Sequence, residues 1–327
     1  MKAGLSVLLR SLGVRRGDKW VLRGITWQLH PGERWALTGH NGAGKTQLLK
    51  IVGGEVWPTR ESARTYRLGR EPIELLDARQ RIGYVGAERQ DKYGRYSWNL
   101  RVREVVATGL HRTDLLLAPI TRAEAAGVAA MLRACGIHTL ARRRFSSLSY
   151  GERRLTLLAR ALVAAPDWLL LDELYNGLDA HFRRRIDAVL SVARRRGQGW
   201  IATAHRAVDV PRGTQRLMEL SAGHIHAVKR LRREDHERLK AMAAEQRQPR
   251  PRRRIPAGSA ALILRLSHVD LYVEQRAVLR DVNWELRRGE HWSVFGRIDN
   301  LFGRQYENPV GFLGPSRGFF VGVKARL

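Results

Sequence analysis

The chain has a single cysteine and no long apolar run, and each shortage excludes a class of protein. Cys135 is the only cysteine among 327 residues, so no disulfide can form within the chain. An apolar run such as residues 168–171 suits a buried strand, whereas a membrane-spanning helix needs roughly 20 apolar residues. The first residues lack a continuous apolar region and a small-residue cleavage site. We therefore expect a globular protein of the cytoplasm.

Acidic residues are also scarce. The chain has 31 of them against 59 lysines and arginines, which leaves a formal net charge of +28. Much of the excess lies in residues 229–240 and 247–254. Such a charge is typical of proteins that bind nucleic acid or an anionic membrane. Because no groove of interleaved aromatic and basic residues accompanies it, we favour a solvated surface, although a nucleic-acid partner stays open as an alternative.

The strongest organisational signal is an internal repeat. Residues 21–29 recur as residues 278–286, and a Gly-Glu turn follows in both copies. The match then ends after Gly39 in the first copy and after Gly296 in the second. Apolar and polar residues alternate within each copy, which predicts two strands joined by a turn. The constant spacing indicates a duplicated segment.

The repeat and the composition together divide the chain into four parts. Residues 1–245 form one large domain, and residues 246–260 are rich in arginine and proline, which predicts an extended linker. Residues 261–296 hold the truncated second copy. Residues 297–327 match neither copy of the repeat.

A phosphate-binding loop follows the first copy. Its pattern is carried by Gly39, Asn41, Gly42, Gly44, Lys45 and Thr46. Glycines allow backbone N–H groups to close around phosphates, Lys45 is expected to reach the β- and γ-phosphates, and the Thr46 hydroxyl is expected to ligate Mg²⁺. Residues 35–38 read as a buried strand and residues 46–52 as a helix, so the phosphates would lie at a helix N-terminus.

Two carboxylates end a second apolar strand. Residues 168–171 are followed directly by Asp172 and Glu173. Behind a phosphate-binding loop, this pattern predicts that Asp172 supports the Mg²⁺ ion. Glu173 is then the general base that polarises an attacking water.

Residues 148–152, Leu-Ser-Tyr-Gly-Glu, resemble the LSGGE-type signature of the ABC ATPases. A helix is expected to follow, because apolar residues recur at helical spacing. Ser149 and Glu152 also fit a simple capping box, which is the structural alternative. The resemblance implies that Ser149 and Gly151 contact the γ-phosphate bound by an opposing subunit. A second ABC domain or a homodimer would therefore complete each ATP site.

Two further elements resemble the same family. Residues 176–179, which end in Asp179, look like the loop that follows the catalytic glutamate, and residues 200–204 form a strand that ends at His205. The resemblance implies that His205 contacts the γ-phosphate, and it covers residues 5–228. It implies an α/β P-loop fold with a mainly parallel sheet, an antiparallel part over residues 5–37 and a helical insert over residues 100–145.

The sequence departs from the family pattern at two contacts. A glutamine is expected soon after the strand at residues 82–85, but Gln90 is the nearest candidate for contacting the γ-phosphate and Mg²⁺, displaced by three residues. The aromatic residue that stacks on adenine is also missing, because Tyr272 of the second copy aligns with Arg15 of the first. Arg15, through its planar guanidinium, and Trp20 are the candidates.

The paired copies resemble soluble tandem ABC proteins of the molybdate-transport type. The tail at residues 297–327 instead resembles the C-terminus of TonB-dependent outer-membrane receptors, with apolar residues alternating from Phe319 onward. One or two strands would leave unpaired edges in lipid, so we do not expect receptor activity. We interpret the chain as a gene fusion of a truncated tandem with a receptor tail.

The resulting functional expectation is an ATP-hydrolysing ABC-type ATPase with ATP and Mg²⁺ as its ligands. The favoured role is the energising subunit of a transporter, possibly for an oxyanion such as molybdate, held by an integral-membrane permease at the inner face of the plasma membrane. The alternatives are a soluble ABC ATPase that acts on nucleic acid or the ribosome, and a degenerate remnant that only binds ATP.

Overall fold

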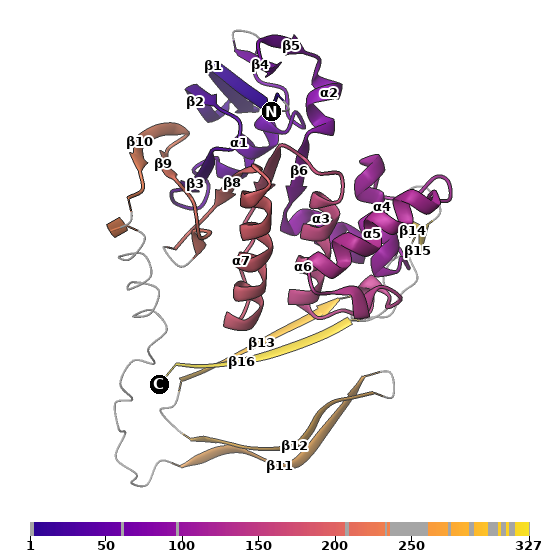
Figure 1. Ribbon diagram of the computed structural model, residues 1–327. Coiled ribbons are helices and arrows are strands. Elements are labelled where there is room, and N and C mark those ends of the chain that lie inside the picture. The colour runs from indigo at the N-terminus through magenta and orange to yellow at the C-terminus, as the bar shows by residue number, and fades with distance from the viewer. Residues whose placement is uncertain are drawn as a thin grey trace. The chain divides into compact units, whose positions relative to one another are not determined.

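In the computed structural model, the strand that precedes the phosphate-binding loop lies inside a six-stranded sheet (Figure 1). The sheet has the order β10-β9-β3-β8-β7-β6, and every neighbouring pair except β9–β10 is parallel. These strands are β3 (Arg34–Thr38), β6 (Ile82–Val85), β7 (Trp168–Leu171), β8 (Gly199–Thr203), β9 (Arg216–Ser221) and β10 (His224–Arg230). The predicted parallel α/β core is confirmed.

The structure describes residues 3–59, 62–95, 98–206, 209–232, 234–235, 261–273, 276–287, 291–299, 307–308, 312–313 and 318–326. Most of the residues up to 245 form one compact unit, and residues 246–327 belong to a second. The predicted linker at residues 246–260 lies outside the described residues. No helix among the described residues is both long and apolar enough to cross a membrane.

A second, antiparallel sheet has the order β2-β1-β4-β5. It contains β1 (Leu5–Arg16), β2 (Lys19–Leu29), β4 (Ala63–Leu68) and β5 (Glu71–Ile73). The prediction that the antiparallel part spans residues 5–37 needs correction, because Trp35 pairs in parallel with Ile201. Strand β3 therefore belongs to the parallel sheet, and β4 and β5 complete the antiparallel one.

Helices flank the parallel sheet and form the predicted insert. Figure 1 shows α3, α4, α5 and α6 gathered beside β6 at the edge of the sheet. The helices are α1 (Lys45–Val52), α2 (Leu75–Gln80), α3 (Ala87–Arg95), α4 (Val102–His111), α5 (Arg122–Ala134), α6 (Tyr150–Leu162) and α7 (Ala180–Arg195). Two short 3-10 helices, His138–Leu140 and Phe145–Ser147, follow α5. The helical insert expected at residues 100–145 is thus present.

The C-terminal unit contains a hairpin whose register repeats that of β1 and β2. Strands β11 (Leu262–Val273) and β12 (Arg276–Arg287) pair Leu266 with Trp284. The corresponding residues Leu9 and Trp27 pair in the first hairpin. The same left-handed backbone also recurs, with φ of 47° at Ser11 and 52° at His268. The two strands predicted on either side of the Gly-Glu pair are present in each copy, as β2 and β3 in the first and as β12 and β13 (His291–Asp299) in the second.

The predicted tail forms a strand that pairs with the second copy. Strand β16 (Gly318–Arg326) runs antiparallel to β13 (His291–Asp299), with Phe319 opposite Ile298. The short strands β14 (Glu307–Asn308) and β15 (Phe312–Leu313) pair with each other. The predicted boundary between residues 296 and 297 falls inside β13, and the division of this region into two parts stays a prediction.

Trp168 connects the two sheets of the first unit. Its ring is fully buried, and its indole Nε1 donates a 2.7 Å hydrogen bond to the Leu5 carbonyl on β1. Trp168→Ala removes both the packing and the hydrogen bond, so we expect a loss of about 3–5 kcal/mol in the free energy of unfolding. Urea denaturation measures this loss.

The matched control is Trp57→Ala, because that ring is 75% exposed. We expect a change within about 0.5 kcal/mol for this variant. Equal losses in the two variants would contradict the structural role given to Trp168.

Candidate functional site

The phosphate-binding loop connects β3 to α1 and requires glycine at its first position. Gly39 has φ of 137°, and a Cβ atom there would lie 2.2 Å from the Leu220 carbonyl oxygen. Gly44 has φ of 96° and a Cβ would lie 2.6 Å from a methyl group of Leu22. No side chain larger than hydrogen fits at either position. The loop therefore keeps its backbone close to neighbouring strands while it turns into α1.

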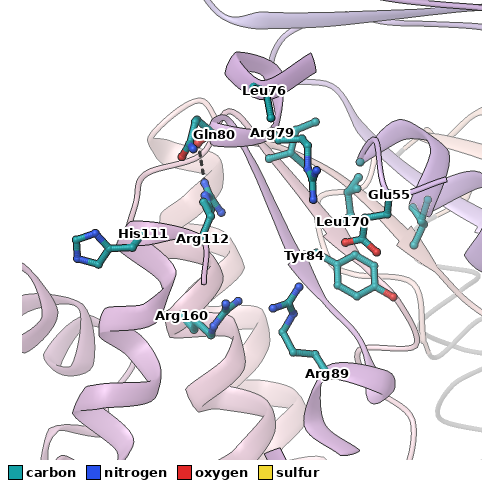
Figure 2. A pocket seen from close by; sticks show the side chains of 13 residues that line it. Glu55, Leu76, Arg79, Gln80, Tyr84, Arg89, His111, Arg112, Arg160 and Leu170 are labelled. Atoms are coloured by element: carbon teal, nitrogen blue, oxygen red, sulfur yellow. Dashed lines mark hydrogen bonds between the residues drawn. The ribbon is translucent and has the colours of Figure 1, made fainter. Parts of the chain in front are cut away.

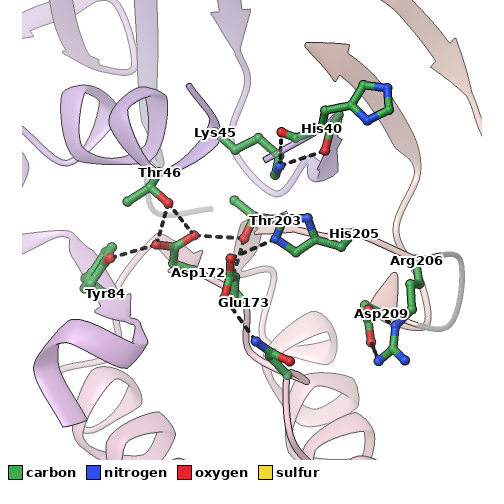
Figure 3. Close-up of polar contacts among 12 residues, drawn as sticks. His40, Lys45, Thr46, Tyr84, Asp172, Glu173, Thr203, His205, Arg206 and Asp209 are labelled. Atoms are coloured by element: carbon green, nitrogen blue, oxygen red, sulfur yellow. Dashed lines mark hydrogen bonds and ion pairs between the residues drawn. The ribbon is translucent and has the colours of Figure 1, made fainter. Parts of the chain in front are cut away.

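Lys45 is the first residue of α1, and its side chain folds back along the loop. The ammonium donates hydrogen bonds to the carbonyl oxygens of Gly39 at 2.8 Å and His40 at 2.9 Å (Figure 3). Burial lowers the pKa of Lys45, while Glu173 and Asp172 act in the opposite direction. The loop thus presents a buried cation at the N-terminus of a helix, an arrangement that suits anionic phosphate groups.

Asp172 is the centre of a cluster of hydroxyl groups just beyond β7. Thr46 donates to its Oδ2 at 2.9 Å, and Thr203 donates to its Oδ1 at 2.9 Å. The Tyr84 hydroxyl donates to Oδ2 at 3.3 Å. Burial and then the charge of Asp172 raise the pKa of Tyr84, so the phenol stays a neutral donor.

The oxygens of Thr46 and Asp172 fit a Mg²⁺ ion that also binds phosphate. Mg²⁺ prefers oxygen ligands, and in phosphate-binding sites it takes one or two protein ligands besides the substrate phosphates. Among the described residues, no group of three or more His, Cys, Asp and Glu side chains could hold a metal. The one carboxylate and one hydroxyl at Asp172 and Thr46 match an ion shared with a phosphate.

Glu173 is held in a strained backbone conformation by three neighbours. Its φ is 49°, and its backbone N–H donates to the Thr203 hydroxyl at 2.8 Å. Its carboxylate contacts His205 Nε2 at 2.8 Å and accepts a hydrogen bond from Asn176 at 3.2 Å (Figure 3). The hydrogen bond from His205 makes the largest contribution to lowering the pKa of Glu173, and burial opposes it. The group is therefore an ionised carboxylate at neutral pH.

Lys45, Thr46, Glu173 and His205 line one pocket with a volume of about 640 Å³, and Asp172 contacts it through the Thr46 hydroxyl. Seven of its lining residues were predicted: Asn41, Gly42, Gly44, Lys45, Thr46, Glu173 and His205. Four were not assigned as site residues: Arg16, Val21, Gln47 and Asn176. The sequence predicts that Asn176 lies in the loop after Glu173 but assigns it no contact. The structure gives it one, since it orients Glu173.

Arg16 lines this pocket, whereas the two residues predicted to contact adenine, Arg15 and Trp20, do not. The guanidinium of Arg15 lies 4.9 Å from the centre of the Trp20 ring, and Arg23 lies 5.6 Å from the same ring. Arg15 and Trp20 therefore stack on each other, and neither lines the pocket. Arg16, the next residue along β1, does line it. Side chains alternate between the two faces of a strand. This alternation could have predicted that Arg15 and Arg16 point to opposite faces and that only one of them lines the pocket.

Two predicted residues, Ser149 and Asp179, cap helices, and a third, Gly151, lies in the first turn of α6. Ser149 caps α6, and its backbone N–H donates to Glu152 Oε2 at 2.8 Å in the expected capping box. Gly151 packs against Phe182, whose ring a Cβ atom would approach to 2.3 Å. The Asp179 carboxylate caps α7 by accepting from the Phe182 backbone N–H at 2.9 Å. None of the three lines the pocket, so their predicted contacts with ATP stay predictions.

Gln90 is buried within α3, and it does not line the pocket. Its Oε1 has no hydrogen-bond partner among the described residues. The side chain that β6 brings to Asp172 is that of Tyr84. The predicted contact of Gln90 with the γ-phosphate and Mg²⁺ stays a prediction.

Comparisons with known proteins agree with this geometry. Residues 22–176 match the family model described as ABC transporter. The chain is 34% identical over 178 residues to an uncharacterized ABC transporter ATP-binding protein, YmeB, of Lactococcus lactis, which covers 54% of this chain and 68% of that one. It is 32% identical over 210 residues to the ABC transporter ATP-binding protein ModF of Escherichia coli, covering 63% of this chain and 42% of that one.

The fold is also that of a solved ATP-binding cassette. The dimeric post-hydrolysis structure of the cassette MJ0796, bound to ADP and Pi, superposes with a TM-score of 0.58 at 20% identity. The similarity covers 69% of this chain and 99% of that one.

The contact between His205 and Glu173 can be tested by titration. Because the hydrogen bond from His205 stabilises the charged carboxylate, His205→Ala is expected to raise the pKa of Glu173. The NMR chemical shift of the Glu173 carboxyl carbon, recorded as a function of pH, measures this pKa. The control His224→Ala, on exposed strand β10, should leave that pKa unchanged. If the pKa of Glu173 stays the same without His205, the contact does not control its charge.

Proposed function

Because this chain belongs to the ABC transporter family of ATP-binding proteins, we propose that its pocket at α1 is where it hydrolyses ATP. The reaction of this family, ATP and water to ADP and phosphate, is the activity of the chain. The observation that carries the assignment of residues is the convergence of Lys45, Thr46, Asp172, Glu173 and His205 at one edge of the sheet.

The loop and α1 bind the phosphates. Backbone N–H groups of Gly42 and Gly44 surround the β-phosphate, and the Lys45 ammonium exchanges its two carbonyl contacts for phosphate oxygens. Thr46 and Asp172 would hold Mg²⁺, which when bound neutralises charge on the β- and γ-phosphates. Arg16 lies at the rim, where its planar guanidinium can stack on the base.

Glu173 carries out the proton transfer. Its ionised carboxylate accepts a proton from a water molecule as the water oxygen attacks the γ-phosphorus, and the bond to the bridging β-γ oxygen breaks. His205 and Asn176 hold the two carboxylate oxygens and so fix the direction of this base. His205, at the rim of the pocket, also donates to the γ-phosphate.

A second copy of the cassette completes each site. Ser149 and Gly151 begin α6, and they do not line the pocket of their own chain. The exposed Ser149 hydroxyl is instead available to the γ-phosphate bound by a facing cassette. The partner is a second copy of this chain or another ABC domain.

The chain is the energising subunit of a transporter, and its membrane partner is a permease at the inner face of the plasma membrane. The transported class proposed is a molybdate-type oxyanion, on the resemblance of the paired copies to tandem ABC proteins of that type. The repeated register of the two hairpins supports descent of residues 261–296 from a second cassette. The tail at residues 297–327 comes from a receptor of the TonB-dependent type. A role on nucleic acid or the ribosome is less well supported, since the similar proteins are named for transport.

Replacing the general base tests the site directly. Glu173→Gln keeps the shape and the hydrogen bond to Asn176 but removes the proton acceptor, so kcat should fall by about 10²–10⁴-fold. ATP binding should be retained, as measured with a fluorescent nucleotide. The control Glu219→Gln changes an exposed residue of β9 and should hydrolyse ATP at the wild-type rate. Hydrolysis by Glu173→Gln at that rate would refute the role of Glu173.

The proposal that two cassettes together form each ATP site is tested by the oligomeric state of Glu173→Gln in the presence of Mg-ATP. We expect light scattering to show a monomer without nucleotide and a dimer with it, because ATP is trapped between two cassettes. Adding Ser149→Arg places a bulky charge at the start of α6 and should prevent the dimer while ATP still binds. A monomer with ATP bound in Glu173→Gln would indicate that another ABC domain is required.

A further inference from the structure

A second hollow of the first unit is lined by arginines. It has a volume of about 270 Å³ and lies where α1, α2, β6 and α6 approach one another. Arg79, Arg89, Arg112 and Arg160 line it, and among the described residues Glu55 is the only carboxylate that does so (Figure 2). It shares no lining residue with the ATP pocket. Four guanidinium groups against one carboxylate make it a strongly cationic cavity.

The charges of these arginines are only partly compensated by the protein. Asp114 is shared, because it accepts from Arg89 at 2.7 Å and from Lys92 and lies 3.8 Å from Arg160. Arg112 donates to the Gln80 carbonyl at 2.8 Å. Within the part of the chain that the structure describes, Arg112 has no carboxylate within ion-pair distance. Its charge is therefore left without a counter-ion.

Buried N–H groups are also left unsatisfied. The Nε atoms of Arg89 and Arg112 are shielded from solvent and lack a hydrogen-bond partner among the described residues. A buried donor without a partner is costly, and a charged one more so. Burial, and then repulsion by Arg160 and Arg89, lowers the pKa of Arg112 to about 10. The guanidinium therefore stays charged at neutral pH.

The backbone at Arg112 is strained as well. It ends α4 in the left-handed region with φ of 56°. Strain of this kind persists where the surroundings enforce it, and it is concentrated at ligand-binding and switch positions. Here it accompanies the guanidinium that has no counter-ion.

We propose that this cavity binds a small oxyanion with a phosphate or carboxylate head. A guanidinium group is planar and pairs with such heads through two parallel hydrogen bonds. The ligand would accept from Arg112 and Arg89, neutralise the uncompensated charge and satisfy the buried Nε donors. Leu49, Ile82 and Leu170 line the cavity too, which suits an anion with a short apolar part.

The cavity is connected to the Mg²⁺-binding side of the ATP pocket by one side chain. The Tyr84 ring lines the cavity, while its hydroxyl donates to Asp172 at 3.3 Å. A ligand that shifts this ring would change the hydrogen bonds of Asp172. The proposal concerns a site separate from ATP hydrolysis and does not depend on the assignment of the catalytic residues.

Calorimetric titration tests the proposal with inorganic phosphate and, separately, with acetate. The protein is first saturated with Mg²⁺ and a non-hydrolysable ATP analogue, so that the phosphate-binding loop is filled, and ionic strength is held constant with chloride. We expect one anion site per chain for at least one of the two probes. A response to phosphate or to acetate identifies the head group.

Arg112→Gln should weaken the anion affinity by about tenfold or more, since one charge-assisted pair is lost. Arg79→Gln is a second variant at an exposed position, so its folding is not at risk, and it should also weaken the affinity. Arg122→Gln, at the exposed start of α5, is the matched control and should bind like the wild type. No binding by either probe up to about 10 mM, or equal binding by all four proteins, overturns the proposal.

Discussion

The site depends on three parallel strands that end at the same edge of the sheet. Strands β3, β8 and β7 are neighbours, with Ala36 opposite Ala202 and Leu171 opposite the same residue. Side chains just beyond the ends of parallel strands converge there, which is where α/β sheets bind their ligands. Lys45 follows β3, Glu173 follows β7 and His205 follows β8. Their meeting is a consequence of strand order.

The strain at Glu173 shows how firmly that edge is held. A non-glycine residue with φ of 49° costs of the order of 1–3 kcal/mol. Thr203 fixes the backbone of Glu173, and His205 and Asn176 fix its carboxylate. Because Thr203 also donates to Asp172, one hydroxyl group links the carboxylate that we propose holds Mg²⁺ to the proposed general base. The backbone of Glu173 and the carboxylate of Asp172 are therefore both held by the Thr203 hydroxyl.

Positive charge has two different physical uses in this chain. Lys45 faces Asp172 and Glu173, whose charges oppose the effect of burial on its pKa. Arg112 faces other arginines, which add to the effect of burial. The charge of Lys45 is partly compensated by these two carboxylates before any phosphate binds. Arg112 has no carboxylate within ion-pair distance among the described residues, and the proposed oxyanion would supply that negative charge.

Local patterns determined much of this protein. Several features each depend on a few consecutive residues, so the sequence alone predicted them. They are the Gly-rich loop, the Asp-Glu pair after β7, the capping box of α6 and the histidine after β8. The family resemblance that these motifs carry also implied the parallel sheet. A short motif carries its own structure because its glycines, caps and apolar runs act within the segment.

Only the tertiary structure decided which distant residues share a surface. Tyr84 and Thr203 reach Asp172 because β6 and β8 flank β7, and no local pattern marks either of them. Arg16 lines the ATP pocket in place of Arg15 because successive side chains of β1 point to opposite faces. The arginine cavity joins residues from α2, α3, α4 and α6, far apart in the chain. Sequence spacing determines which residues follow a strand, but packing between elements determines what those residues face.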